Sequence, residues 1–459
     1  VATVTDTGRL RMTWRGKTIV DLTREFLDTN GVQQEAAVHV EPIGTESPLN
    51  CVAFESFAEA LGDLNISSQK GLGEMFDSSV GAGTVLSPFG GKYQCTPVDA
   101  MVASLPFLEG QTKTCTHMSW GFNPNIATWS PYHGAAYAVT ESVCRAVASG
   151  ARLGDIRLTL QEYFPKLGDD SSRWGLPFAA LLGAFKAQHE LRLGAIGGKD
   201  SMSGTFNDID VPPTLVSFAL APGSTKHVVS PEFKEVDSLI SFIEVPRDEN
   251  QLPDFRMLKK IADILHGANI LAAHTLDHGG IATGLSKMAF GNGIGASIKT
   301  DIDLHQERFL SFLIESKEEI SSGIVIGRTQ VEPTLQVGSD TLKLGELYDA
   351  WTSPLSEIYP ETEDPSSSEA DTFTSTFEAK RSTTKSQNPK VIIPTFPGTN
   401  SEYDSAKAFR EAGAQAEIQV FRNLTPQAVE DSLSNLAESI RKSQILMLPC
   451  LLYTSPSPR

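Results

Sequence analysis

The sequence predicts an α+β fold of two packed modules, followed by the opening of a separate α/β segment. Between residues 83 and 290, strand-like and helix-like apolar patterns mix without strict alternation, which favours α+β over a doubly wound sheet. Residues 361–388 are dominated by Ser, Thr, Glu and Pro and show no period, which is typical of a linker. Strand, helix and strand patterns then follow over residues 390–420, as in a βαβ unit.

The individual elements follow from the spacing of apolar residues and from turn chemistry. Short β-like runs at 83–87 and 100–105 flank a Pro- and Gly-rich turn. Apolar residues recur at helical spacing up to Gly150, and a second helix is expected at 177–191, ended by Gly194. The other expected strands are 10–19, 214–220, 239–245, 270–274, 390–394, 416–420 and 444–448, and the other expected helices are 255–266, 281–290 and 399–412.

These patterns predict six parts along the chain. With 459 residues, two or three cores are expected rather than one. Pro212, Pro213 and Gly223 punctuate the boundary between the two modules. The parts are a connector at 1–60, a first α+β module at 61–223, a second at 224–360, the linker at 361–388, an α/β segment cut off at its third strand at 389–450, and a non-native tail at 451–459.

Composition limits the class of function. A formal net charge of -18 argues against binding to nucleic acid, which depends on clustered Lys and Arg. The five cysteines have no spacing suited to a disulfide framework or a zinc site, so a reducing cytoplasm is expected. No apolar run approaches the roughly 20 residues that span a bilayer, and the first residues lack the apolar core of a signal peptide. No membrane partner is therefore expected.

The most informative motif is GGKDSMS at residues 197–203. Two glycines let backbone amides approach an anion, while Lys199, Ser201 and Ser203 supply donors, so a phosphate site is predicted. The motif is not a P-loop, because Leu193 stands where the first glycine is required and Asp200 where a hydroxyl residue is required. On local chemistry alone, a tight glycine turn with surface Lys and Ser remains an alternative.

Three motifs together carry a resemblance to a known family: AIGGKDSMS at 195–203, FGGKY at 89–93 and WSPYHGA at 129–135. Up to residue 359 the chain resembles the second synthetase half of the long, single-chain phosphoribosylformylglycinamidine synthases. Residues 391–449, with FPGTN at 396–400 and ILMLP at 445–449, are similar to the start of that family's class I glutaminase domain.

The resemblance implies a PurM-like half of two modules, which packs its sheet against a related half and creates two quasi-equivalent nucleotide sites. Residues 1–60 would end the preceding half. The implied activity is ATP- and glutamine-dependent amidation of formylglycinamide ribonucleotide in purine synthesis. This piece would lack its first half and the rest of the glutaminase, so it is expected to be inactive alone. The alternatives are a structural nucleotide-binding half without turnover, or another ATP-dependent kinase or synthetase of the superfamily.

The resemblance also implies roles for the residues of the glycine motif. Gly198 would lie against ATP, Lys199 near its metal-bound phosphates and Ser201 against the ribonucleotide. Gly197, Asp200 and Ser203 complete the predicted nucleotide and substrate site. No catalytic residue is assigned within the chain, because the family's catalytic His motif belongs to the missing half.

ATP and Mg²⁺ are the implied cofactors. Asp99 and Glu141 match family carboxylates that hold Mg²⁺ beneath a nucleotide, although an exposed Asp at a strand end and a Glu on a helix surface remain the alternative. Arg145 and His278 stand where many relatives have Asn and Asp. Arg cannot bind Mg²⁺ and His binds it poorly, so Arg145 is expected to contact phosphate directly as a cation, in a degenerate second site.

Three further residues could suggest chemistry. His274 and His278 are four apart, but the glycines that follow favour a turn over a zinc-binding helix. His133 can line the cleft or serve as a hydrogen-bonded structural residue. Cys450 is not expected to be the glutaminase nucleophile, because the resemblance places that residue on a later strand-to-helix turn.

Overall fold

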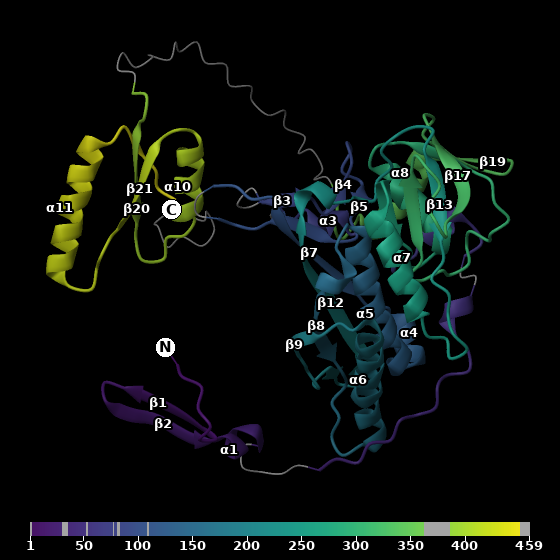
Figure 1. Cartoon of the computed structure of the whole chain (residues 1–459), viewed down its shortest axis with the longest axis horizontal. Helices are drawn as coiled ribbons and strands as arrows, with labels where there is room; N and C mark the ends of the chain where they lie inside the picture. The colour runs from purple at the N-terminus through teal and green to yellow at the C-terminus, as the bar shows by residue number, and fades with distance from the viewer. Residues whose placement is uncertain are drawn as a thin grey trace.

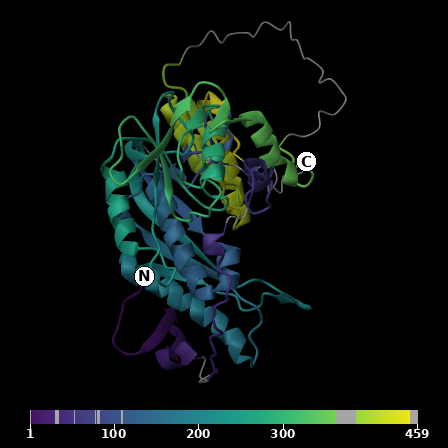
Figure 2. The same cartoon turned by 90° about the vertical axis from the view of Figure 1, so that its right-hand side faces the viewer.

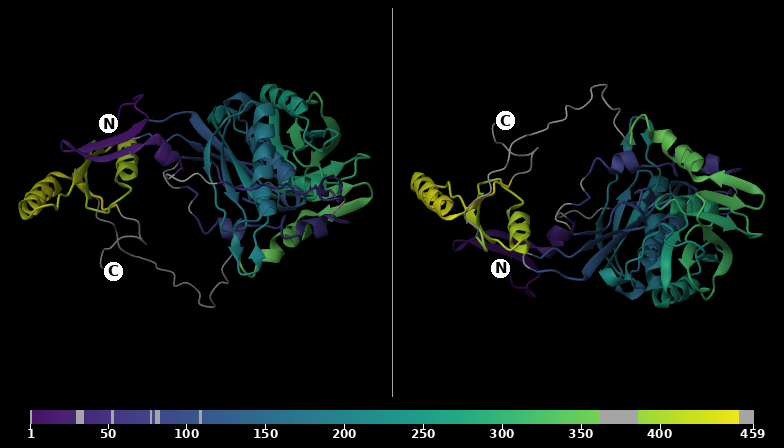
Figure 3. Two further views of the ribbon diagram at one scale, coloured as in Figure 1. Left: turned by 90° about the horizontal axis from the view of Figure 1, so that it is seen from below. Right: turned by 90° about the horizontal axis from the view of Figure 1, so that it is seen from above.

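The computed structural model of the chain describes residues 2–29, 35–51, 54–76, 78–79, 83–107, 110–361 and 386–449. Two large sheets and their helices form the body of the molecule (Figure 1). A third, smaller sheet and an N-terminal hairpin lie outside this body (Figures 1 and 3). The α+β class is confirmed. Most of the predicted linker at 361–388 and all of the predicted tail at 451–459 lie outside the described residues.

The first sheet has six strands in the order β3-β6-β7-β12-β8-β9, with only β8 and β9 running parallel. Alternation sets its two faces: in β7, Cys115, His117 and Ser119 are buried, whereas Met118 and Trp120 are exposed. The strands are β3 (Thr84–Leu86), β6 (Met101–Ser104), β7 (Thr114–Gly121), β12 (Thr214–Ser224), β8 (Arg157–Tyr163) and β9 (Ala195–Lys199).

In the part of the chain that the structure describes, the long helices pack against one face of this sheet. α5 (Pro131–Ala148) begins at Ser130, whose hydroxyl accepts the amide of His133, and Pro131 occupies the first helical position. Small residues let α5 pack closely against α4 (Pro124–Trp129), α6 (Ser171–Leu191) and strands β7 and β12, so that most of its side chains are buried. Figure 2 shows these long helices beside the sheet.

The second sheet has seven strands in the order β14-β16-β13-β17-β15-β18-β19, and only β15 and β18 run parallel. Helix α8 follows a turn in which Gly279 and Gly280 have φ of 79° and 62°. The strands are β13 (Leu239–Ile243), β14 (Ile270–Thr275), β15 (Gly295–Ile298), β16 (Phe312–Ser316), β17 (Ile324–Gln330), β18 (Thr334–Val337) and β19 (Asp340–Lys343), and the helices are α7 (Phe255–Gly267), α8 (Gly280–Phe290) and α9 (Leu344–Thr352).

The two modules share a hydrophobic core. Residues of α5 and α6 pack in one cluster with α7 and with one face of the second sheet, which contributes Ile243, Phe312 and Ile314. The other face of the second sheet packs against α8 and α9 around Trp351, whose indole donates to the Ile66 carbonyl at 2.7 Å. Burial on both faces explains why every residue of β13 and β16 is buried and why most of them are apolar.

The remaining elements are smaller. The third sheet is parallel, in the order β21-β20-β22. Across the described ranges, every helix is too short or too polar to span a lipid bilayer. The elements are β20 (Lys390–Thr395), β21 (Gln415–Val420), β22 (Ile445–Leu446), α10 (Glu402–Glu411), α11 (Pro426–Lys442), β1 (Arg9–Trp14), β2 (Lys17–Thr23), α1 (Arg24–Thr29), α2 (Phe57–Leu61), α3 (Lys70–Gly73), β4 (Phe89–Gly90), β5 (Thr96–Pro97), β10 (Thr205–Phe206), β11 (Ile209–Asp210), and the 3₁₀ turns Pro48–Asn50, Leu153–Asp155, Thr225–His227 and Ser353–Leu355.

Three expected elements were wrong in their limits. Residues 10–19 are not one strand but parts of the hairpin β1–β2, because Arg15 and Gly16 adopt φ of 49° and 76° and reverse the chain. Helix α6 begins at Ser171, not at Pro177, because Asp170 caps it by accepting two backbone amides. The glycine motif, expected as a bend at 197–203, instead begins inside the edge strand β9 (Ala195–Lys199).

Candidate functional site

The glycine strand, β9, lies at one edge of the six-stranded sheet, and all five of its residues are exposed. Gly198 pairs with Leu160 of β8, and a Cβ on Gly198 would lie 2.3 Å from the Leu160 carbonyl oxygen. Gly197 has φ of 147°, which side chains rarely adopt. Both positions therefore require glycine, and the strand presents bare backbone to solvent.

The predicted donors lie on and directly after this strand. The ammonium of Lys199 lies 5.5 Å from the centroid of the Tyr163 ring, and Lys199 forms no ion pair among the described residues. The hydroxyls of Ser201 and Ser203 are 3.0 Å apart, and Asp200 is exposed. The predicted donor set is therefore gathered at one sheet edge, and the Lys199 ammonium has no carboxylate partner there.

An open hollow of about 460 Å³ lies beside the glycine strand. Its floor combines the exposed backbone of β9 with the adjoining strand β8, so the bare backbone is accessible to a ligand. The hollow is lined by Thr159, Leu160, Gln161, Ile196, Gly197, Gly198, Lys199 and Phe218.

A second group of predicted residues forms a buried ion cluster, which we define as Glu141, Arg145, Asp277 and Lys287. Arg145 Nη2 lies 2.6 Å from Glu141 Oε1 and 3.5 Å from Asp277 Oδ2, and Lys287 Nζ lies 3.3 Å from Asp277 Oδ1. Burial by itself would raise the pKa of Asp277, but the charges of Lys287 and Arg145 outweigh it and lower the pKa to about 2. Asp277 is therefore held ionised between two cations.

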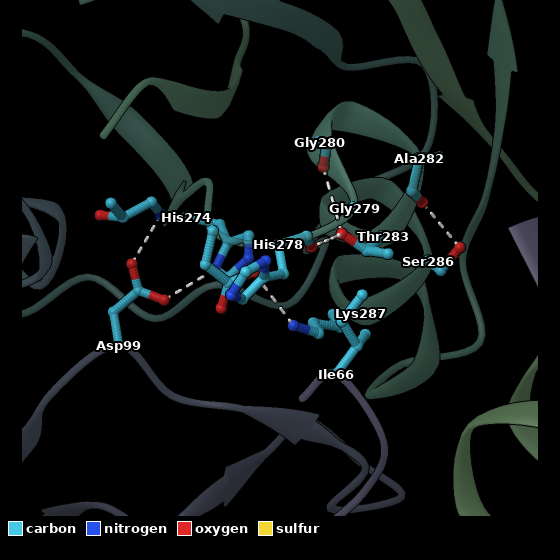
Figure 4. Close-up of polar contacts among 12 residues, drawn as sticks. Ile66, Asp99, His274, His278, Gly279, Gly280, Ala282, Thr283, Ser286 and Lys287 are labelled. Atoms are coloured by element: carbon cyan, nitrogen blue, oxygen red, sulfur yellow. Dashed lines mark hydrogen bonds and ion pairs between the residues drawn. The ribbon is translucent and has the colours of Figure 1, made fainter. Parts of the chain in front are cut away.

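Asp99 lies beside this cluster, where it is fixed by the end of β14 (Figure 4). Its Oδ1 lies 2.7 Å from His274 Nδ1, and its Oδ2 accepts the Thr275 amide at 2.7 Å. The other ring nitrogen of His274 is buried and has no hydrogen-bond partner among the described residues. The carboxylate of Asp99 thus already receives a donor on each oxygen.

His278 stands on the turn before α8 (Figure 4), and each of its ring nitrogens has a partner. Nε2 lies 2.9 Å from the Asn123 amide nitrogen, and Nδ1 lies 3.6 Å from Glu307 Oε1. Burial lowers the pKa of His278, but the hydrogen bond and charge of Glu307 outweigh this and raise it. Glu307 also accepts the Gly279 amide, so it fixes the whole turn.

These contacts test whether the residues fit the divalent cation that the resemblance implies. Mg²⁺ requires near-octahedral oxygen ligation and usually keeps several waters. Here Glu141 is bound by Arg145 and by the Phe122 amide at 3.0 Å, and Asp99 is bound by the end of β14. Within the described ranges, no three His, Cys, Asp or Glu side chains gather as a metal-binding group. The arrangement therefore does not fit a resident Mg²⁺.

The structure separates the predicted site residues into two regions. The glycine strand lies at the sheet edge beyond β8, whereas Arg145 sits over the Trp120 ring of β7 at 4.5 Å from its centroid, three strands away. Sequence reasoning missed Asp277, Lys287 and Glu307. A lysine within the apolar residues 281–290 was the available signal, because a buried lysine requires a partner.

The contacts of His133 fit the role of a hydrogen-bonded structural residue. Its Nδ1 lies 2.8 Å from the Ser130 hydroxyl and its Nε2 lies 2.9 Å from the Asn250 carbonyl oxygen, with the side chain buried. These contacts join the start of α5 to the loop before α7. Cys450 lies outside the described residues.

Comparisons with known proteins found two kinds of sequence similarity. Residues 388–450 match the model of the CobB/CobQ-like glutamine amidotransferase domain. The phosphoribosylformylglycinamidine synthase subunit PurL of Thermoplasma volcanium is 25% identical over 327 residues, covering 65% of this chain and 41% of that protein. The PurL of Sulfurimonas denitrificans is 24% identical over 387 residues, covering 76% of this chain and 50% of that protein.

Solved structures of similar proteins include two of Thermotoga maritima PurL. One is complexed with FGAR, with 18% identity and a TM-score of 0.48, and covers 70% of this chain and 47% of that chain. Another is complexed with ATP, with 16% identity and a TM-score of 0.46, over 70% of this chain and 49% of that chain. This chain thus spans about half the length of such relatives. In sequence, this chain is therefore similar to phosphoribosylformylglycinamidine synthase subunits over most of its length and to a glutamine amidotransferase domain over residues 388–450.

Proposed function

We propose that the chain is part of an ATP- and glutamine-dependent phosphoribosylformylglycinamidine synthase. One observation carries the proposal: a single chain joins a region similar to PurL subunits to a segment similar to a glutamine amidotransferase domain. A synthetase that receives ammonia from glutamine needs both parts. A superfamily kinase would not need the second part.

In the proposed reaction, ammonia released from glutamine amidates formylglycinamide ribonucleotide. ATP transfers its γ-phosphoryl group to the amide oxygen of the ribonucleotide and leaves as ADP. Ammonia then attacks the amide carbon of this iminophosphate, and phosphate departs with the oxygen. The contribution of the protein is to position the phosphates and to offset their charge.

The glycine strand is the part of this chain that we assign to the nucleotide. Bare backbone at Gly197 and Gly198 allows close approach of phosphates. Lys199 supplies a cation that forms no ion pair with a carboxylate among the described residues. Ser201 and Ser203 supply hydroxyl donors for the ribonucleotide, with Asp200 between them. The adjoining hollow of about 460 Å³ supports this assignment. Mg²⁺ enters as the counter-ion of ATP.

A related synthetase half is the proposed partner of the six-stranded sheet. Helices cover one face of that sheet, while Met118, Trp120 and Leu220 remain 40%, 48% and 42% exposed on the other. That face borders a hollow of about 510 Å³. An apolar sheet face of this kind is normally covered, which supports packing against a second sheet.

The N-terminal hairpin supports the proposal that residues 1–60 end a preceding half. β1, β2 and α1 repeat the order of β18, β19 and α9, which close the second sheet. Leu335 of β18 is fully buried by that sheet, whereas Leu10 and Met12 of β1 are 46% and 50% exposed. The remaining proposed boundaries are modules at 61–223 and 224–360, the linker at 361–388, the amidotransferase-like segment at 389–450 and a non-native tail at 451–459.

The proposed compartment is the cytoplasm. Cys51, Cys95, Cys115 and Cys144 are free thiols, which is typical of a reducing compartment.

ATP binding by the purified chain tests the assignment of the glycine strand. Titration with Mg-ATP should show weak binding, and Lys199→Ala should lower the affinity roughly 10- to 100-fold, because a charge-assisted contact to phosphate contributes about 1.5–3 kcal/mol. Lys260→Ala, on the exposed surface of α7, is the matched control and should bind as the wild type does. Equal affinities of the two variants would remove Lys199 from the site.

A second candidate is a structural half that binds a nucleotide without consuming it. The ion pairs of Arg145 with Glu141 and Asp277 favour it, because they occupy the second region with side chains. Activity of the full-length enzyme separates the two. A catalytic glycine strand predicts a large loss of turnover in Lys199→Ala, whereas a structural half predicts that both Lys199→Ala and Arg145→Ala lower stability alone.

A further inference from the structure

The buried ion cluster supplies its own positive charge. Arg145 comes from α5 of the first module and contacts two carboxylates, Glu141 on the same helix and Asp277 on the turn before α8. Lys287, from α8, contacts the other oxygen of Asp277 and is only 6% exposed. Two carboxylates and two cations thus balance each other in charge.

The guanidinium of Arg145 is held in place on several sides. It lies over the Trp120 ring at 4.5 Å, and its side chain is 12% exposed. Glu141 is in turn fixed by the Phe122 amide at 3.0 Å. A metal ion bound by Glu141 and Asp277 would have to displace Arg145 from both carboxylates.

The neighbouring carboxylates also bind groups of the protein itself. Asp99, on the segment between β5 and β6, contacts His274 and Thr275 of β14. Glu307 is 2% exposed at its side chain and accepts the Gly279 amide. Asn123, before α4, reaches His278. The contacts of Asp99 and Asn123 join the first module to the second, whereas the contact of Glu307 lies within the second module.

We propose that the ion cluster is a metal-independent clamp between the two modules, in which Arg145 and Lys287 occupy the place that a divalent cation would need. The proposal goes beyond the amidation proposed above and concerns a different region from the glycine strand. The result of the Lys199→Ala test therefore does not affect the clamp proposal. Failure of the clamp proposal, in turn, does not affect the assignment of the nucleotide to the glycine strand.

The first test compares thermal unfolding of the wild-type chain in excess EDTA and in excess MgCl₂, with no nucleotide present. A clamp built from side chains predicts the same midpoint in both, within about 1 °C, because no native-state ligand is removed. A midpoint that falls by several degrees in EDTA and recovers with Mg²⁺ would overturn the proposal.

The second test replaces Arg145 by Asn, which removes the cation that faces Glu141 and leaves Asp277 with Lys287 alone. Arg145→Asn should lower the midpoint by more than about 5 °C, since breaking a buried pair leaves a buried charge. Lys287→Met should also lower it. The control is Arg173→Asn, because Arg173 and Asp210 form an exposed pair, 35% and 37% accessible. Arg145→Asn with wild-type stability would overturn the clamp, and if this variant does not fold, the EDTA comparison decides.

Discussion

Gly198→Ala should detach the glycine strand from the sheet while leaving the rest of the fold intact. The added Cβ would lie 2.3 Å from the Leu160 carbonyl oxygen, whereas ordinary contact begins at 3.4 Å. The obstacle is backbone, so no side chain can move aside. β9 must therefore retreat from β8 by about 1 Å, which separates the pairs Leu160–Gly198 and Gln161–Lys199.

The magnitude follows from the hydrogen bonds at stake. Two backbone pairs at about 0.5–1.5 kcal/mol each give a local loss of about 1–3 kcal/mol. Because β9 is an exposed edge strand, this loss should appear as local opening rather than as global unfolding. Amide hydrogen exchange at β9 should accelerate about 10- to 100-fold, with weaker ATP binding and little change in the thermal midpoint.

Gly194→Ala is the matched control, because a Cβ there would meet no heavy atom within 4 Å and Gly194 precedes the same strand. Its exchange rates and ATP affinity should stay close to those of the wild type. Unchanged exchange in Gly198→Ala would refute the argument that close approach of β8 fixes this glycine.

Two further predictions concern the modules. The pKa of Asp277 is lowered to about 2, so its contribution to stability is present above the unfolded value of 3.8 and is lost as the pH falls toward 2. Urea unfolding between pH 5 and 2 should show this loss of stability. Asp277→Asn should make the stability depend less on pH over this range. Trp351→Ala should lower the free energy of unfolding by about 3–5 kcal/mol, because a side chain with 2% exposure leaves a cavity; urea unfolding measures it, and a loss below about 1 kcal/mol would contradict the assigned packing.

The sequence predicted the elements whose apolar period was strong. The helices at 255–266 and 281–290 and the strands at 239–245 and 270–274 lie close to their observed limits. Strand β7 was missed, because its sequence TCTHMSWG does not alternate between apolar and polar residues. The polar residues His117 and Ser119 lie on its buried face, where apolar residues are expected. His117 is accommodated there by the Ser149 hydroxyl at 2.9 Å, a contact 32 residues distant in sequence.

The candidate site was predictable only in its residue types. The motif at 197–203 indicated glycines and donors, but whether they form a bend or an edge strand depends on β8, which contacts them from about 40 residues away in sequence. Arg145 was expected to meet phosphate. The structure gives it two carboxylate partners, and Asp277 comes from 132 residues further along the chain. Such partners cannot be read from local spacing.

The two regions differ in how many of their charged and polar groups already have partners, and this difference supports the assignment of the nucleotide to one of them. In the ion cluster, each cation faces a carboxylate and each carboxylate has a donor, so an incoming phosphate would have to break existing pairs. At the glycine strand, exposed backbone and an ammonium without a described carboxylate partner stand beside an open hollow. A phosphate there gains contacts and displaces only water. Charge matching therefore supports the proposal that the nucleotide binds at β9, while α5 and α8 hold the modules together.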